Sequence, residues 1–225
     1  MAQSDWVLTR GTTSASLNSG LSNPLPAGVG SSFCRFFNAD SPGLGPTLRT
    51  NKAEFINIPS TKALSATICI RRQAGLNPNQ FVGFRLKGTT ANYITVGNGN
   101  GYGIALQSGP NGVPVIKVNN TDSLSLDGLP TGSFYDNNWI RLRLDVFPIG
   151  LGADQLFAYR ETTIGSGVWD AIGISGGLPA NGVTILSSSP RYAAWGTGSV
   201  YIECTTSAGN SYYIDTFTLS VTDVP

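Results

Sequence analysis

The chain has 225 residues, and only 12% of them are charged, which is about half the fraction found in an average soluble domain. The chain has 14 lysines and arginines against 13 aspartates and glutamates, a formal net charge of +1. This charge gives no net field to attract nucleic acid or an anionic membrane. Histidine is absent, which excludes Ser-His-Asp and Cys-His catalysis, histidine-ligated metals and an imidazole pH switch.

Residues 1–30 are rich in Ser, Thr, Leu, Asn and Gly, and contain Pro24 and Pro26 close together. This composition predicts an N-terminal arm or extended loop that packs on the domain, with one strand-like piece from Trp6 to Thr9. The first ten residues have neither the basic nor the apolar region of a signal peptide, and no apolar run approaches the ~20 residues that span a bilayer. We therefore expect an arm over 1–30, a single domain over 31–225, and no secretion signal.

From Ser31 onward, short apolar and β-branched runs alternate with clusters of Gly, Pro and Asn, and no segment of ten or more residues keeps a helical period. This pattern predicts an all-β fold: a two-sheet antiparallel jelly-roll sandwich with an extended N-terminal arm. The expected strands cover residues 32–38, 53–58, 64–72, 80–87, 93–97, 102–107, 113–118, 123–126, 139–147, 155–161, 167–173, 200–206 and 212–221.

The segment from Trp139 to Phe147 gives the clearest strand signal, because apolar side chains at the even positions alternate with polar and aromatic ones. The same alternation over 80–87 places Arg85 and Lys87 outward. If these strands share a sheet, its outer face carries several arginines, whose planar guanidinium groups pair and stack well at interfaces. A solvated sheet face is the alternative to a docking surface. The predicted partner-binding residues are Trp6, Arg71, Arg85, Arg141 and Arg143.

The cysteines, Cys34, Cys69 and Cys204, are odd in number and widely spaced, which fits neither a disulfide framework nor a zinc site. Each lies in a β-branched or aromatic run. We expect buried free thiols, with a single disulfide as the alternative.

The sequence patterns that could indicate a catalytic or metal site each lack a required part. The G-x-S-x-G pattern at 173–177 lacks both a following helix and a histidine base, so it indicates a turn. Glu54, Glu161 and Glu203 are too far apart in sequence for the paired carboxylates of a sandwich glycosidase on one strand. A calcium site near Asp122, Asp127 or Asp136 has no D-x-D spacing to support it. We predict no catalytic residue, no cofactor and no metal.

Several stretches resemble a family of tailed-bacteriophage virion proteins with a concanavalin A or laminin G-like sandwich. They are SDWVLTRG, SLNSGLSNPLPAGVGSSFCRFFNADS, TNKAEFINI, NNWIRLRLDV, GVWDAIG and YYIDTFTLS. The resemblance implies a non-enzymatic particle component, either a capsid decoration or cement protein or a tail-associated accessory. It would assemble in the host cytoplasm, contact other virion proteins and form a homo-oligomer.

Two rival functions stay open. A carbohydrate-binding module for host-surface attachment would use aromatic and amide side chains in the loops at 97–103 and 136–139. A glycosidase or lyase would need carboxylates brought together from separate strands. Neither reading involves nucleic acid or a membrane.

Overall fold

The structure is a computed structural model, and it describes residues 5–10, 16–19, 32–37, 47–72, 80–88, 101–108, 114–118, 122–127, 138–150, 152–174, 182–188, 192–193, 195–196, 198–204 and 211–224. Within these ranges the chain forms strands and short 3-10 segments, among them the turn η2 (Ala53–Phe55), with no α-helix. None of the described segments is a helix that is long and apolar enough to cross a membrane.

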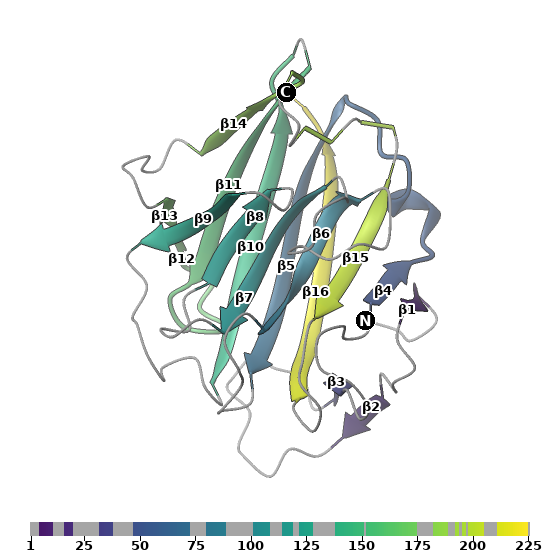
Figure 1. Cartoon of the computed structure of the whole chain (residues 1–225), viewed down its shortest axis with the longest axis vertical. Coiled ribbons are helices and arrows are strands. Elements are labelled where there is room, and N and C mark those ends of the chain that lie inside the picture. Colours follow the sequence, from purple (N-terminus) through teal and green to yellow (C-terminus); the bar gives the residue numbers. More distant parts are fainter. Residues whose placement is uncertain are drawn as a thin grey trace.

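The strands form two sheets that face each other (Figure 1). Sheet A has the spatial order β1 (Trp6–Arg10), β4 (Thr47–Thr50), β15 (Ser199–Cys204), β6 (Gln80–Gly88), β7 (Tyr102–Ser108), β8 (Pro114–Val118), β9 (Asp122–Asp127) and β13 (Gly173–Ile174). Sheet B has the order β12 (Trp169–Ala171), β11 (Ala153–Glu161), β10 (Trp139–Pro148), β5 (Lys62–Arg72), β16 (Ser211–Asp223), β3 (Ser32–Phe37) and β2 (Ser16–Ser19). The short strand β14 (Val183–Leu186) pairs with the first half of β11. The predicted two-sheet antiparallel sandwich is confirmed.

The core lies between the sheets and follows the predicted alternation. On β10, Leu142 and Leu144 are fully buried, and Leu142 lies opposite Ile68 of β5 in the antiparallel register. Sheet A supplies Phe84 from β6, which is also fully buried. The inner faces are therefore apolar, as the period-2 pattern of the sequence requires.

The structure differs from the predicted strands at residues 53–58, where Ala53–Phe55 form the turn η2 and the next three residues belong to no strand. The backbone N–H of Phe55 donates to the carbonyl of Lys52 at 3.0 Å, and Asn57 has a positive φ of 57°, which an extended strand does not allow. The strands β2, β4 and β14, of four residues each, were not predicted. The predicted strand at 93–97 lies outside the described residues.

The N-terminal segment contributes edge strands to both sheets. β1 pairs with β4 in sheet A, and β2 pairs with β3 in sheet B. These two pieces of the predicted arm are therefore hydrogen-bonded to the sandwich, and the boundary at residue 30 stays a prediction.

Candidate functional site

Charged and aromatic side chains from β10, β11 and β12 gather on the outer surface of sheet B. They alternate with the buried core residues of the same strands, and cross-strand pairing brings Arg143 opposite Tyr159 and Glu161 opposite Trp169. We call this surface the sheet-B face and define it by Arg141, Arg143, Asp145, Tyr159, Glu161 and Trp169.

Arg143 is the centre of the sheet-B face. Its Nε and Nη2 donate to the two carboxylate oxygens of Asp145 at 2.8 and 2.6 Å, and this bond raises the pKa of the guanidinium. The guanidinium carbon lies 4.9 Å from the ring centre of Tyr159 and 5.8 Å from that of Trp169. Asp145 is buried, while 33% of the Arg143 side chain is exposed. The guanidinium is therefore held in one orientation and remains accessible.

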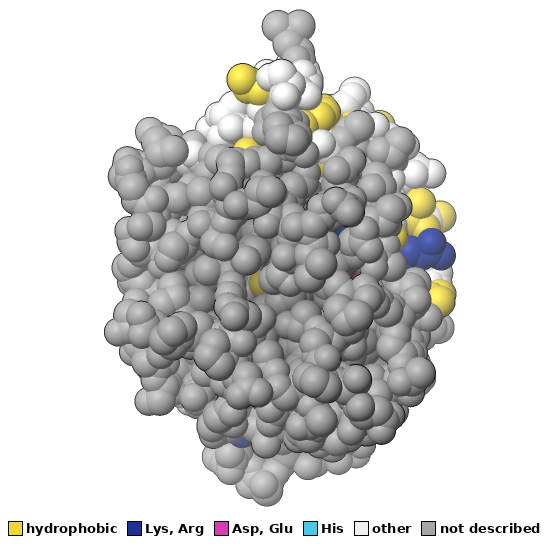
Figure 2. Space-filling view, in the orientation of Figure 1, with side chains coloured by type: hydrophobic (Ala, Val, Ile, Leu, Met, Phe, Trp, Pro, Cys, Tyr) yellow, Lys and Arg dark blue, Asp and Glu magenta, His cyan; other side chains and the backbone are white. Residues whose placement is uncertain are grey.

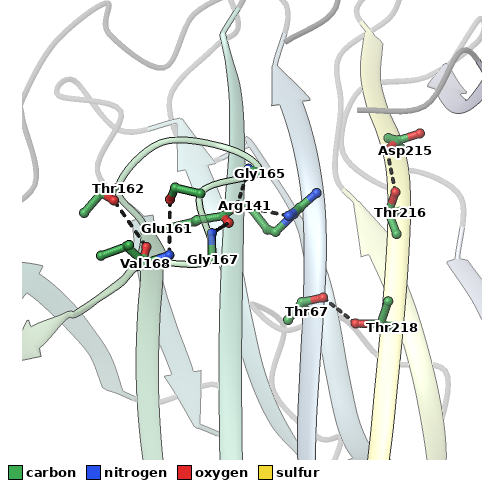
Figure 3. A network of polar contacts seen from close by, with 11 residues as sticks. Thr67, Arg141, Glu161, Thr162, Gly165, Gly167, Val168, Asp215, Thr216 and Thr218 are labelled. Atoms are coloured by element: carbon green, nitrogen blue, oxygen red, sulfur yellow. Dashed lines mark hydrogen bonds and ion pairs between the residues drawn. The ribbon is translucent and has the colours of Figure 1, made fainter. Parts of the chain in front are cut away.

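The carboxylate of Glu161 closes the loop between β11 and β12 (Figure 3). It accepts hydrogen bonds from the backbone N–H groups of Gly165 and Gly167 at 3.1 and 2.8 Å, and from Nη1 of Arg141 at 3.0 Å. The Glu161 side chain is 1% exposed. Its oxygens thus fix the loop that carries Trp169 toward Arg143.

Of the four predicted docking arginines, three share sheet B. Arg141 and Arg143 lie on β10 and Arg71 on the neighbouring strand β5. Arg71 is only 6% exposed and has the ring of Tyr213 at 5.5 Å from its guanidinium carbon. On the neighbouring strands β5 and β16, the hydroxyls of Thr67 and Thr218 form a hydrogen bond with each other (Figure 3).

The expectation that Arg85 shares an open face with the other arginines is wrong. Arg85 belongs to β6 in sheet A, where its Nη2 pairs with Oε1 of Glu203 at 2.6 Å and its guanidinium lies against Tyr201. The two side chains of this ion pair are 3% and 0% exposed. Trp6 also packs inward, with its ring 5.4 Å from that of Phe217. Alternation along β6 predicted that Arg85 points away from Phe84, but it did not predict that Arg85 is buried.

Lys87 is likewise buried rather than solvated, because the backbone leaves the extended conformation there with a φ of 56°. Its Nζ donates to Oδ2 of Asp154 on β11 at 2.8 Å, which links the two sheets. Three aromatic rings surround the ammonium: Trp195 at 3.8 Å, Tyr102 at 4.9 Å and Tyr192 at 5.3 Å. We call these five residues the lysine cage.

Asp154 organises the lysine cage. The phenol of Tyr102 and the indole Nε1–H of Trp195 both donate to its carboxylate at 2.6 Å, and the backbone N–H of Ala193 donates to the oxygen of Tyr102 at 3.0 Å. Burial lowers the pKa of Lys87 to about 8, against the opposing effect of Asp154. The sequence did contain one sign of the lysine cage. Asp154 stands two residues before Leu156 and four before Ala158, so it points to the buried side of the strand, where an acid needs a partner.

The remaining predicted sites have mixed outcomes. Cys69 and Cys204 are free and buried, as expected, and the side chain of Cys34 lies outside the described residues. Within the described residues no group of three or more acidic or cysteine side chains is placed to hold a metal ion. Asp136, the side chains of Asp122 and Asp127, and most of both candidate glycan loops also lie outside them.

No family model and no curated protein matches this chain. Among solved structures it is similar to a carbohydrate esterase from the Shiga toxin-encoding bacteriophage phi24B, with 14% identity, a TM-score of 0.57, and coverage of 97% of this chain and 90% of that one. The VIP36 exoplasmic/lumenal domain, in its Ca²⁺/Man3GlcNAc-bound form, matches with 12% identity, a TM-score of 0.51 and coverage of 98% and 85%. The cellulose-induced protein Cip1 matches with 13% identity, a TM-score of 0.52 and coverage of 98% and 93%.

The chain has a lectin-like β-sandwich fold. At these identities the likeness establishes the fold alone, since such sandwiches carry many functions.

Proposed function

We propose that this chain is a non-enzymatic structural component of a tailed-bacteriophage particle, and that it docks on a neighbouring virion protein through the sheet-B face. The observation that carries the proposal is the fixing of Arg143 by Asp145, Tyr159 and Trp169 while a third of its side chain stays exposed. Arginine and aromatic side chains dominate the energetics of protein interfaces. Because Arg143 is already ordered, little side-chain entropy is lost when a partner binds.

The placement of the glutamates supports a non-catalytic role. Glu161 accepts three hydrogen bonds that hold the β11–β12 loop, and Glu203 is fully buried in its pair with Arg85. Glu54 lies on η2 and not on a strand. A general acid must reach a substrate. The carboxylates of Glu161 and Glu203 are buried and already bonded to other groups of the protein, so they are not placed to do so.

Docking is tested by replacing Arg143 and measuring incorporation into particles. We expect Arg143→Ala to reduce the copy number in purified particles at least tenfold, and Arg143→Lys to reduce it less, because lysine keeps the charge but loses the two-oxygen contact with Asp145. Lys62→Ala is the matched control, since Lys62 pairs with Asp223 at the start of β5, outside the sheet-B face. Thermal unfolding of each variant separates loss of docking from loss of fold.

Two results would contradict the docking proposal. The first is absence of the wild-type chain from particles purified to constant composition. The second is wild-type incorporation of a folded Arg143→Ala variant.

A second candidate function is glycan recognition at the host surface. It is favoured by the lectin-like fold together with the partly exposed aromatic side chains Tyr159, Trp169, Tyr192 and Trp195. A glycan array with the full chain is the direct test. Binding to no glycan on an array that covers bacterial surface polysaccharides argues against this function and leaves the docking proposal intact.

A further inference from the structure

A pocket of about 280 Å³ opens at the end of the sandwich where β10 and β16 finish and β11 begins. Figure 2 shows hydrophobic side chains at this upper end of the molecule. We call it the end pocket. Its walls include the aromatic side chains of Tyr192 and Trp195, and Gly150 and Gly152 from the β10–β11 connection.

The lysine cage holds the aromatic wall of the end pocket in place. The indole N–H of Trp195 donates to Asp154 and the ammonium of Lys87 lies 3.8 Å from the ring centre, so the orientation of the ring is fixed from behind. Tyr192 also contacts this ammonium, at 5.3 Å. A preformed aromatic wall of this kind can bind a ligand without first being ordered.

None of the described residues that line the end pocket has a charged side chain. Lys87 and Asp154 lie behind Trp195 with side chains 3% and 0% exposed, and they compensate each other at 2.8 Å. The lining residues provide aromatic and apolar surface and the hydroxyl group of Ser60. They also provide backbone at Gly150, which has no side chain to cover it and faces open space. A charged ligand would find no partner among them, whereas one with a flat C–H surface and hydroxyl groups would match both kinds of wall.

We infer that the end pocket binds one neutral pyranose ring, with its C–H face stacked on Trp195. The volume is just below the roughly 300–1,000 Å³ of sites for drug-sized molecules, which favours a single ring over an extended oligosaccharide. The inference rests on the second candidate function, glycan recognition, and gives it a site separate from the sheet-B face.

The test is titration of the full chain with a panel of neutral methyl pyranosides, followed by calorimetry and tryptophan fluorescence. We expect Val224→Trp, which fills the end pocket while all five residues of the lysine cage keep their identity, to weaken binding at least tenfold. Trp195→Leu should have the same effect. Trp139→Leu is the matched control, because Trp139 begins β10 and the pocket residue Pro148 ends it, about 30 Å away at ~3.3 Å per residue. It should change affinity less than twofold.

The outcomes separate the site from the function. If a pyranoside binds wild type and binds Val224→Trp and Trp195→Leu equally well, the end pocket is not the site, although glycan recognition stands. Loss of binding in Trp139→Leu alone also overturns the pocket and favours the opposite end of the sandwich. If no pyranoside binds the wild-type chain and the array is negative, both the inference and glycan recognition fail.

Discussion

Replacing Asp154 with asparagine tests the electrostatic reading of the lysine cage. Asparagine keeps the size of the side chain but has one acceptor oxygen instead of two, so in the present geometry it can accept from Tyr102 or from Trp195 but not from both. It also removes the charge that faces Lys87. Both partners of this ion pair are buried, with side chains 3% and 0% exposed. Removing one partner of a buried pair leaves an uncompensated charge and costs about 3–5 kcal/mol.

The chemistry of lysine sets an upper limit on this cost. A buried lysine can lose its proton instead of staying charged, and at pH 7 deprotonation from an ordinary pKa near 10.4 costs about 4.6 kcal/mol. We therefore expect Asp154→Asn to lower the free energy of unfolding by about 3–4.6 kcal/mol. In Lys87→Met/Asp154→Asn the loss should be much smaller than the sum of the two single losses, since the double variant buries no charge.

Urea unfolding followed by tryptophan fluorescence measures these values, provided that the slope against urea stays the same among variants. The reasoning fails if Asp154→Asn costs under 1 kcal/mol. It also fails if the double variant equals the sum of the singles to within about 0.5 kcal/mol, because additivity would mean that the two side chains do not interact.

Three further predictions concern pH, the β11–β12 loop and the thiols. The pKa of Lys87 is about 8 in the folded chain and 10.5 unfolded, so between pH 8 and 10.5 the unfolded state binds more protons and the free energy of unfolding rises with pH. The rise attributable to Lys87, on the order of 1–3 kcal/mol, should vanish in Lys87→Met, and an identical pH profile for both proteins would contradict it. Glu161→Gln should speed hydrogen exchange at the amides of Gly165 and Gly167 at least tenfold, and unchanged protection would show that the carboxylate does not hold the loop. Burial raises the pKa of Cys69 to about 12, so Cys69 should resist alkylation at pH 8 until the chain unfolds, and rapid labelling of native protein would refute its burial.

The sequence was sufficient to predict the fold class because alternation is a local property. Ile140, Leu142 and Leu144 identify the buried face of β10 without any knowledge of its neighbours. The same reasoning assigned Arg143 to the outer face, where it lies. It could not reveal that Tyr159 is opposite Arg143, because strand pairing is decided by long-range register.

The errors arise where something other than alternation determines the position of a side chain. Lys87 is buried because its backbone adopts a positive φ, a feature that no apolar pattern encodes. Arg85 follows the predicted phase but belongs to the other sheet and pairs with Glu203. Asp154 was detectable in principle, since an acid among core positions of a strand needs a buried partner, but its partner lies 67 residues away in sequence.

Many of the few charged side chains in the described part of this chain are used in ion pairs rather than displayed singly on the surface. Among the described residues, four ion pairs have at least one buried side chain, and they orient neighbouring groups: Arg85–Glu203, Lys87–Asp154, Arg141–Glu161 and Arg143–Asp145. The surfaces that these pairs support are therefore close to neutral but rigid. Such surfaces discriminate by shape, stacking and hydrogen bonding rather than by long-range attraction. That property suits both proposed sites, because contacts among many copies in a particle and stacking on a neutral sugar each depend on geometry rather than net charge.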